Sequence, residues 1–427
     1  MAERVINSLL DTDLYKLTMH AAVFQNFPDA EVVYKYTNRS SQLHFNSDAI
    51  AWLLDQIDLL GELRFSPEEI EYLGKEIEYF PRAYLDYLKD FKLDPKRQIE
   101  FATQAVEGTS DRFDLEILVK GKWMDTILYE IPVLSLVSEA YFKYVDTDWT
   151  YEGQVEQAKA KALKLFENQI KFSEFGTRRR RSLKAQDMVM EGIMSAVNED
   201  AESYSQCFLG TSNVFFAKKF GVKPIGTVAH EWFMGIAAIT NDYPNANKNA
   251  MDFWINTFGA EHAGLALTDT FGTDNFLVSF RRPYSDYYVG VRQDSGDPIE
   301  YTKKIANHYH NVLNLPLFSK VVCYSDSLDI EKAIKYAHVA QEHGLLATFG
   351  IGTNLTNDFR RRSDPSLKSE PLNIVIKLLE VNKRHAVKIS DNLAKNMGDP
   401  KTVLRVKKEL GYVERSWAGD TEAHRWV

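Results

Sequence analysis

The chain has 427 residues, of which 44% are hydrophobic and 26% are charged, and its formal net charge is -9. This length predicts two or three domains with a large core, and the acidic balance argues against bulk electrostatic binding to nucleic acid or to an anionic membrane. Two cysteines are too few for a disulfide framework and indicate free thiols in a reducing compartment. The sequence shows neither the apolar core of a signal peptide nor a membrane span, so we expect a soluble cytoplasmic protein, with the nucleus as a second compartment.

The first 145 residues predict an α+β region. Helical spacing runs over Ser8–Phe27, a strand follows at Val32–Tyr36, and the residues from Ser66 to Glu69 have the pattern of a helix capping box. Phe113–Lys120 alternates apolar and polar residues, as expected of a half-buried strand. No recognisable catalytic constellation stands out in this region.

From about Asp146 the pattern changes to alternating strands and helices. Such alternation predicts parallel strands with right-handed crossovers, and we expect an irregular α/β barrel of about seven parallel strands. The predicted strands are Ile170–Phe175, Gln206–Gly210, Lys223–Val228, Leu265–Thr268, Tyr288–Arg292, Lys320–Tyr324 and Leu346–Gly350. The predicted helices are Tyr151–Asn168, Ser182–Asn198, Glu231–Asp242, Pro298–Leu313 and Ile330–His343.

The last part of the chain loses this alternation. Asn373–Val381 and His385–Ile389 predict a hairpin across Asn382 and Lys383, and Asp399–Leu410 predicts a helix. We therefore expect three parts: an N-terminal α+β domain at residues 1–145, an α/β barrel at 146–365, and a tail at 366–427 that packs back on the N-terminal domain and completes it.

Polar residues stand at the carboxyl end of every predicted strand. In a parallel barrel these ends meet at one rim, where α/β proteins carry their functional groups. One polar strand end is ordinary, but seven together are hard to explain by solubility alone. The ends are Glu174–Arg178, Gly210–Ser212, Thr227–His230, Thr268–Thr270, Arg292–Asp297, Ser325–Ser327 and Gly350–Asn354.

These strand ends supply three kinds of group. Glycine beside hydroxyls, at Gly210–Ser212 and Gly350–Asn354, is typical of backbone cradles for phosphate. Arg178 and Arg292 supply cations. The carboxylates are of the kind that holds Mg²⁺ together with substrate phosphates, although the sequence does not say which of them binds a metal; they are Asp269, Asp294, Asp297 and Asp326.

His230 follows the predicted strand at Lys223–Val228, just before a helix. Beside phosphates and Mg²⁺, a histidine serves as an acid, a base or a nucleophile that accepts a phosphoryl group, whereas a lone histidine is more often a buried or capping residue. Arg178–Arg181 likewise has an ordinary alternative, a solvated basic face or a localisation patch. Phe175 is placed to stack on a flat ring.

The segments SEFGTRRRRSLKAQD, LGTSN, GTVAHEW, LTDTFGT, VRQDSGDP, YSDSLD and FGIGTN, in this order, resemble the nicotinate phosphoribosyltransferases. DTDLYKLTMHAAVF near the start and KISDN near the end also fit, and the resemblance covers nearly the whole chain, with the fungal and enterobacterial branch most similar. It implies an irregular α/β barrel joined to an α+β domain built from both ends of the chain. It also implies transfer of a phosphoribosyl group from phosphoribosyl pyrophosphate to nicotinate, coupled to ATP hydrolysis, as a step into NAD biosynthesis.

The resemblance also implies roles for individual residues. His230 would be phosphorylated by ATP, and Asp269 or Asp294 would stabilise the reacting ribosyl centre. Residues for nicotinate would be Tyr15 and Phe175, which hold the pyridine ring, together with Ser212, Thr227 and Arg292; nicotinamide enzymes carry an acid in place of Ser212. Residues for phosphoribosyl pyrophosphate and product would be Arg178, Ser325, Asp326, Gly352 and Thr353.

Two other functions remain open from the sequence. The same fold could use nicotinamide, which Ser212 and Arg292 argue against, or the chain could be a non-catalytic sensor of nucleotides or polyanions built on Arg178–Arg181. A metal-dependent hydrolase would need several histidines at the strand ends, and only His230 is found there. We expect ATP as co-substrate, Mg²⁺, no prosthetic group, and a homodimer if Tyr15 reaches the site of a neighbouring subunit.

Overall fold

The computed structural model describes residues 3–392 and 395–413. The chain forms two compact units, each built from several segments. The first unit comprises Met1–Leu163, Glu174–Gly226 and Gly352–Lys377, and the second comprises Lys164–Ser173, Thr227–Ile351 and Leu378–Val427. The three-part division expected from the sequence stays a prediction.

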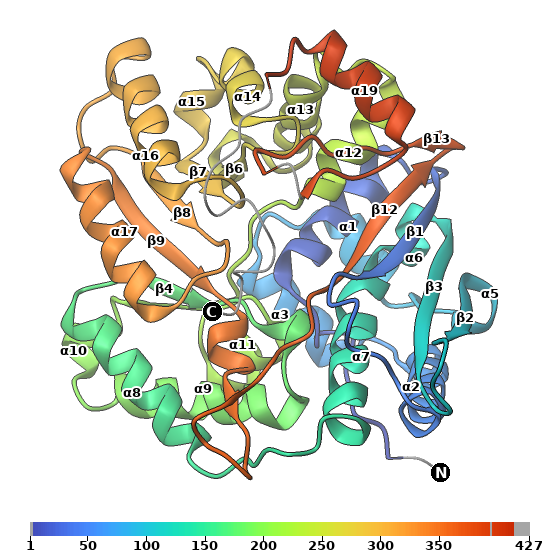
Figure 1. Ribbon diagram of the computed structural model, residues 1–427. Helices are drawn as coiled ribbons and strands as arrows, with labels where there is room; N and C mark the ends of the chain where they lie inside the picture. The colour runs from blue at the N-terminus through green and yellow to red at the C-terminus, as the bar shows by residue number, and fades with distance from the viewer. Residues whose placement is uncertain (1–2, 393–394, 414–427) are drawn as a thin grey trace. The chain divides into compact units, whose positions relative to one another are not determined.

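An antiparallel sheet unites strands from near both ends of the chain (Figure 1). Its buried residues alternate along β3, where Leu115, Ile117 and Val119 point to the core. Asn382 and Lys383 both have positive φ, as a two-residue hairpin turn requires, so the predicted turn is confirmed, although the second strand is Arg384–His385 and not His385–Ile389. The strand order is β13-β12-β1-β3-β2, with β1 at Glu31–Asn38, β2 at Ile99–Ala105, β3 at Phe113–Lys122, β12 at Ile374–Val381 and β13 at Arg384–His385.

The helices of the first unit largely follow the predicted pattern. At α3 (Pro67–Glu76), Ser66 and Glu69 form the expected capping box. The predicted helix at Ser8–Phe27 begins only at Leu14, because the backbone before it pairs with residues 212–215, including an isolated bridge between Asp13 and Asn213. The remaining helices are α1 (Leu14–Asn26), α2 (Ser47–Leu59), α4 (Arg82–Leu88), α5 (Pro95–Gln98), α6 (Trp123–Thr126), α7 (Glu130–Tyr144), α8 (Gln154–Glu167), α9 (Leu183–Val197), α10 (Ala201–Tyr204), α11 (Val214–Phe220) and α18 (Thr353–Thr356).

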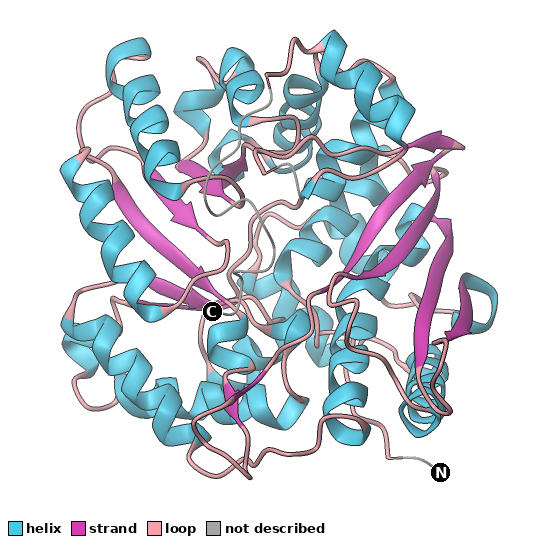
Figure 2. Cartoon of the chain, in the orientation of Figure 1, coloured by secondary structure: helices cyan, strands magenta, loops and turns pink. Residues whose placement is uncertain are grey.

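The alternating region forms a second sheet, whose neighbours β6, β7, β8 and β9 are parallel. Figures 1 and 2 show α16 and α17 running alongside β8 and β9. The order is β5-β4-β9-β8-β7-β6, with β4 at Phe172–Glu174, β5 at Phe208–Thr211, β6 at Leu265–Leu267, β7 at Gly290–Gln293, β8 at Val321–Tyr324 and β9 at Leu346–Ile351. The helices of the second unit are α12 (His230–Thr240), α13 (Ala246–Phe258), α14 (Thr273–Ser279), α15 (Tyr284–Tyr287), α16 (Pro298–Asn307), α17 (Ile330–Glu342) and α19 (Pro400–Glu409).

One of the seven predicted strands is wrong. Lys223–Val228 makes only an isolated parallel bridge, between Pro224 and Thr211. Pairing is limited to the two bonds that Lys223 O and Ile225 N make with Thr211, at 3.2 and 2.8 Å. Pro224, between them, has no N–H to donate to a second neighbouring strand. The α/β class with a second, antiparallel sheet is confirmed, and the closed barrel stays a prediction.

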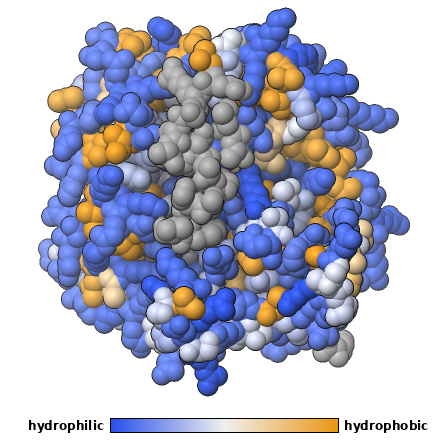
Figure 3. Space-filling view, in the orientation of Figure 1, coloured by the Kyte–Doolittle hydropathy of each residue, from blue (hydrophilic) through white to orange (hydrophobic). Residues whose placement is uncertain are grey.

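The surface is mostly hydrophilic on the face shown in Figure 3, as expected from a chain in which 26% of the residues are charged. Apolar side chains are scattered among the hydrophilic ones on that face (Figure 3). Both cysteines, Cys207 and Cys323, are buried free thiols, as expected. Among the described residues, no helix has both the length and the apolar character needed to cross a membrane.

Candidate active site

His230 is the first residue of α12 and lies in the second unit. Ala229 precedes it in extended conformation, so the helix begins at the residue that carries the imidazole. Only 6% of the side chain is exposed. Nδ1 lies 3.0 Å from the Thr270 hydroxyl, which can either donate or accept a hydrogen bond. The histidine is therefore held on one side and its Nε2 atom is left to other partners.

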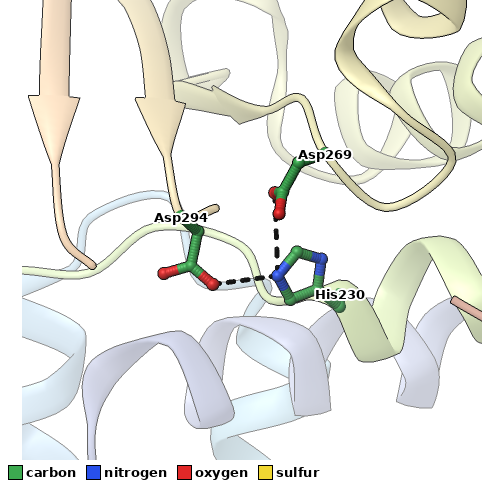
Figure 4. A group of neighbouring side chains, drawn as sticks. All are labelled: His230, Asp269 and Asp294. Carbon is green, nitrogen blue, oxygen red and sulfur yellow. Dashed lines mark hydrogen bonds and ion pairs between the residues drawn. The ribbon is translucent and has the colours of Figure 1, made fainter. Parts of the chain in front are cut away.

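Two carboxylates approach the same nitrogen of this imidazole (Figure 4). Asp269 follows β6 and Asp294 follows β7, and these parallel neighbours end at the same edge of the sheet. Asp294 Oδ2 lies 3.0 Å from His230 Nε2, and Asp269 Oδ1 lies 3.7 Å from it. Parallel pairing thus brings together Asp269 and Asp294, as predicted from the strand ends, and the start of α12 places His230 beside them.

Lys388, a residue that sequence reasoning did not single out, completes this group. Its ammonium lies 3.0 Å from His230 Nε2 and 3.5 Å from Asp269 Oδ2, and its side chain is 4% exposed. The next residue, Ile389, donates its backbone N–H to Thr270 O at 2.7 Å. This bond aligns the KISDN segment with the loop that carries Asp269. The motif was visible in the sequence, but its place beside His230 was not.

Arg292, on β7, connects most of the predicted residues of the second unit. Its guanidinium donates to Thr227 Oγ1 at 2.7 Å, to Ser325 Oγ at 2.8 Å and to Asp294 Oδ1 at 2.9 Å. Lys395 extends the network, because it pairs with Asp326 at 2.5 Å and donates to Asp294 O at 3.0 Å. The seven predicted residues of this unit therefore belong to one connected cluster.

Burial and charge set the protonation of this cluster. Burial and the Lys388 ammonium lower the pKa of His230 to about 4, although Asp269 and Asp294 act to raise it. Burial acts to raise the pKa of Asp294, but the Arg292 charge and the hydrogen bond with His230 hold it well below its usual value. At neutral pH the site therefore contains a neutral imidazole between ionised carboxylates and fixed cations.

The three residues of Figure 4 have the composition of a metal site, but their surroundings do not suit one. Ligand-type atoms of His230, Asp269 and Asp294 lie within 4.8 Å of one another. The Lys388 ammonium, however, lies 3.0 and 3.5 Å from two of these side chains and already supplies the positive charge that the carboxylates need. A divalent ion at this point would be repelled by that ammonium. Asp297, another candidate, instead caps α16 by accepting from Ile299 N and Glu300 N.

The remaining predicted residues lie in the first unit. Ser212 donates to Asp13 Oδ1 at 2.8 Å, and its carbonyl accepts from Leu14 N, directly before Tyr15. Gly352 packs against Phe175, because an added Cβ would lie 2.8 Å from Phe175 O. Thr353 is the next residue and opens α18. Tyr15 and Phe175 each keep part of their ring exposed.

Arg178 has buried acidic neighbours that the sequence did not reveal. Glu130 Oε1 lies 3.5 Å from the Arg178 guanidinium, and Glu130 Oε2 pairs with the fully buried Lys16 at 2.7 Å. Burial acts to raise the pKa of Glu130, but the charges of Lys16 and Arg178 hold it below its usual value. Arg178 itself remains 35% exposed, so its charge is both anchored and accessible.

The other arginines of the run are structural. Arg180 is buried and makes a two-pronged ion pair with Asp11, each bond 2.7 Å long. Arg181 is also buried, with its guanidinium 3.5 Å from the ring centre of Phe142 and 4.4 Å from that of Phe359. A solvated basic face or localisation patch is therefore wrong for these two residues. The role of Arg178 in binding a substrate stays a prediction.

Two family models match the sequence of this chain. Residues 170–414 match the nicotinate phosphoribosyltransferase (NAPRTase) family, and residues 10–138 match the NAPRTase N-terminal domain. Together the two ranges include every predicted site residue and Lys388. The resemblance drawn from short motifs thus extends over most of the sequence.

Individual proteins with the same family name are also similar to this chain in sequence and in structure. A nicotinate phosphoribosyltransferase from Saccharomyces cerevisiae is 70% identical over 429 residues, covering 100% of both chains. A crystal structure of an S. cerevisiae protein is 69% identical with a TM-score of 0.96, and it covers 97% of this chain and 100% of its own. A nicotinate phosphoribosyltransferase structure from Porphyromonas gingivalis is 32% identical with a TM-score of 0.85, covering 95% and 100%.

The depressed pKa of His230 predicts how this residue titrates. Its pKa of about 4 lies below the value of about 6.5 expected in the unfolded chain. We expect an NMR titration to show a neutral His230 from pH 8 to pH 5, with assignment by comparison to His230→Asn. Since the unfolded chain takes up this proton first, the free energy of unfolding should fall as the pH drops from about 6.5 to about 4. A titration midpoint above pH 6 would contradict the burial described here.

Because aromatic rings surround Arg181, replacing its planar guanidinium should destabilise the folded protein. Arg181→Lys should lower the free energy of unfolding by about 1–3 kcal/mol, because an ammonium cannot stack on Phe142 and also bond Ser369 in the same way. Urea unfolding measures this change. The matched variant Arg362→Lys, at an exposed position, should change stability by less than about 0.5 kcal/mol. Equal effects of the two substitutions would rule out a special role for the stacked arginine.

Proposed function

The chain belongs to the nicotinate phosphoribosyltransferase family, and we propose that it is an enzyme that joins nicotinate to the phosphoribosyl group of phosphoribosyl pyrophosphate. The products are nicotinate mononucleotide and pyrophosphate, and the reaction leads into NAD biosynthesis. The observation that carries this proposal is the cluster of the second unit, where the Asp294 carboxylate lies 2.9 Å from the Arg292 guanidinium and 3.0 Å from His230 Nε2. It combines a fixed cation for an anionic substrate with carboxylates and a neutral imidazole.

Charge complementarity supports nicotinate as the acceptor. Nicotinate carries a carboxylate, and a guanidinium such as that of Arg292 is its natural partner. Arg292 is 12% exposed and is held by Thr227, Ser325 and Asp294, so its charge is oriented before a substrate arrives. We assign Thr227 and Ser212 to nicotinate as well, and Tyr15 and Phe175 to its ring.

The cations and hydroxyls at the predicted strand ends support a phosphorylated donor. We assign Arg178, Ser325, Asp326, Gly352 and Thr353 to phosphoribosyl pyrophosphate and to the product. Departure of pyrophosphate builds negative charge that Arg178 can stabilise. Asp269 and Asp294 are ionised beside the imidazole and can stabilise a positively charged ribosyl centre. Mg²⁺ in this proposal is the counter-ion of the pyrophosphate group of the donor.

ATP coupling forms the second part of the proposal. We assign to His230 the acceptance of a phosphoryl group from ATP, because its imidazole is neutral at pH 7 and has a lone pair to offer. Phosphorylation adds negative charge among Asp269 and Asp294, and hydrolysis removes it, so the modification can act as a reversible switch.

The proposal also includes a homodimer, in which Tyr15 of one subunit reaches the site of the other.

Pyrophosphate release tests the reaction directly. Purified protein with nicotinate, phosphoribosyl pyrophosphate and Mg²⁺ should release pyrophosphate, and ATP should increase the rate. Nicotinamide in place of nicotinate should react at least about tenfold more slowly, because it lacks the charge that Arg292 binds. Faster reaction of the amide would favour a nicotinamide enzyme. Tight anion binding without any pyrophosphate release would favour a non-catalytic sensor.

Removing the imidazole tests the coupling. His230→Ala should abolish ATP hydrolysis and its stimulation of transfer, while leaving slow uncoupled turnover, because the carboxylates and Arg292 remain. The rate of pyrophosphate release, measured with and without ATP, gives both quantities. Full ATP stimulation in His230→Ala would show that the phosphoryl group is carried elsewhere.

A further inference from the structure

The buried ammonium of Lys388 is aimed at the imidazole of His230. We propose that Lys388 is a positioning residue that holds His230 in the tautomer with its proton on Nδ1 and its lone pair on Nε2. The Nζ–Nε2 distance is 3.0 Å, and both side chains are less than 7% exposed. Nothing in the sequence argument assigned a role to this lysine.

The proposal follows from what each group can donate or accept. An ammonium has three N–H donors and no acceptor, so a hydrogen bond with His230 requires an unprotonated Nε2. A neutral imidazole then carries its single proton on Nδ1. That proton has an acceptor, because the Thr270 hydroxyl lies 3.0 Å from Nδ1. Both nitrogens are satisfied in this arrangement.

Asp294 favours the opposite tautomer. Its Oδ2 atom lies 3.0 Å from the same Nε2, and a carboxylate can only accept a hydrogen bond. Asp294, however, has other partners: its Oδ1 accepts from Arg292 NH2 at 2.9 Å and from Ser325 Oγ at 2.9 Å. The Lys388 ammonium lies farther, at 3.5 Å, from its neighbouring acceptor Asp269 Oδ2. Losing the hydrogen bond with His230 Nε2 would therefore cost the buried Lys388 more free energy than losing the contact would cost Asp294.

The backbone fixes the lysine at this distance. Lys388 forms an antiparallel bridge with Met397, with bonds of 3.0 and 3.1 Å in the two directions. Ile389 N donates to Thr270 O, and Asp391 accepts from Thr273 N at 2.9 Å. The segment is thus attached on both sides to the loop that carries Asp269 and Thr270. Lys388 and Thr270, which contact the two ring nitrogens, are held in register with each other.

The inference deepens the proposed function and rests on it for one consequence only. If His230 accepts a phosphoryl group at Nε2, the fixed tautomer keeps that nitrogen, rather than Nδ1, unprotonated without a prior proton transfer. Replacement of Lys388 should then lower ATP-stimulated pyrophosphate release by about a hundredfold. The tautomer itself is a property of the substrate-free protein, so it can be measured whether or not the proposed reaction occurs.

The test is the ¹⁵N spectrum of the histidine rings in the full chain at pH 7, without substrate. A protonated ring nitrogen and an unprotonated one have well-separated ¹⁵N shifts, and His230 is identified by comparison with His230→Asn. We expect an unprotonated Nε2 and a protonated Nδ1 in the unmodified protein. A protonated Nε2 there would overturn the proposal without any lysine variant, so the test does not depend on a variant folding.

Substitutions at Lys388 then show whether the lysine causes the tautomer. Lys388→Met removes the donor and should move the proton to Nε2, where Asp294 accepts it. Lys388→Arg retains a donor and should preserve the original spectrum. The matched control is Lys303→Met, at an exposed lysine of α16 that pairs only with Glu300 among the contacts described; it should leave the His230 shifts unchanged. An unchanged His230 spectrum in Lys388→Met would refute the assignment, even if pyrophosphate release were lost.

Discussion

The cluster of the second unit depends on one shared carboxylate. Asp294 divides its two oxygens between different partners, with Oδ1 accepting from Arg292 and Ser325 and Oδ2 facing His230. A buried carboxylate is costly unless charges and hydrogen bonds compensate for its lost hydration. Arg292 supplies most of that compensation, and in return the carboxylate orients the guanidinium. A single acidic side chain thereby fixes the relative positions of a cation, a hydroxyl and an imidazole.

The same principle recurs in the first unit, where charges are buried in pairs. Asp11 receives two bonds from Arg180, and Glu130 lies between Lys16 and Arg178. In these two examples each buried charge has a partner of opposite sign, and the partner comes from a distant part of the chain. Such pairs favour one arrangement of the loops over others, because a misplaced loop would leave a charge unpaired. The loop conformation is specified by charge as well as by apolar packing.

The sequence predicted much of this architecture because its signals are local. Strand and helix alternation, the capping box at Ser66 and the hairpin turn at Asn382 depend on neighbours in the chain. The meeting of Asp269 and Asp294 also followed, since parallel strands align their ends. The strand predicted at Lys223–Val228 is reduced to an isolated bridge, and Pro224 within it has no N–H to donate to a second neighbouring strand. Burial of Arg180 and Arg181 could not be predicted, because their partners lie far away in sequence.

Lys388 shows the same limit within the cluster, since its place depends on a backbone bond to Thr270 more than a hundred positions earlier. That dependence has a consequence for synthesis. A ribosome makes His230, Asp269, Arg292 and Asp294 well before it reaches Lys388 and Lys395. A nascent chain that has folded its parallel strands still lacks the two ammonium groups that balance its clustered acids. The cluster of the second unit can therefore be completed only after the segment that carries Lys388 and Lys395 has been synthesised.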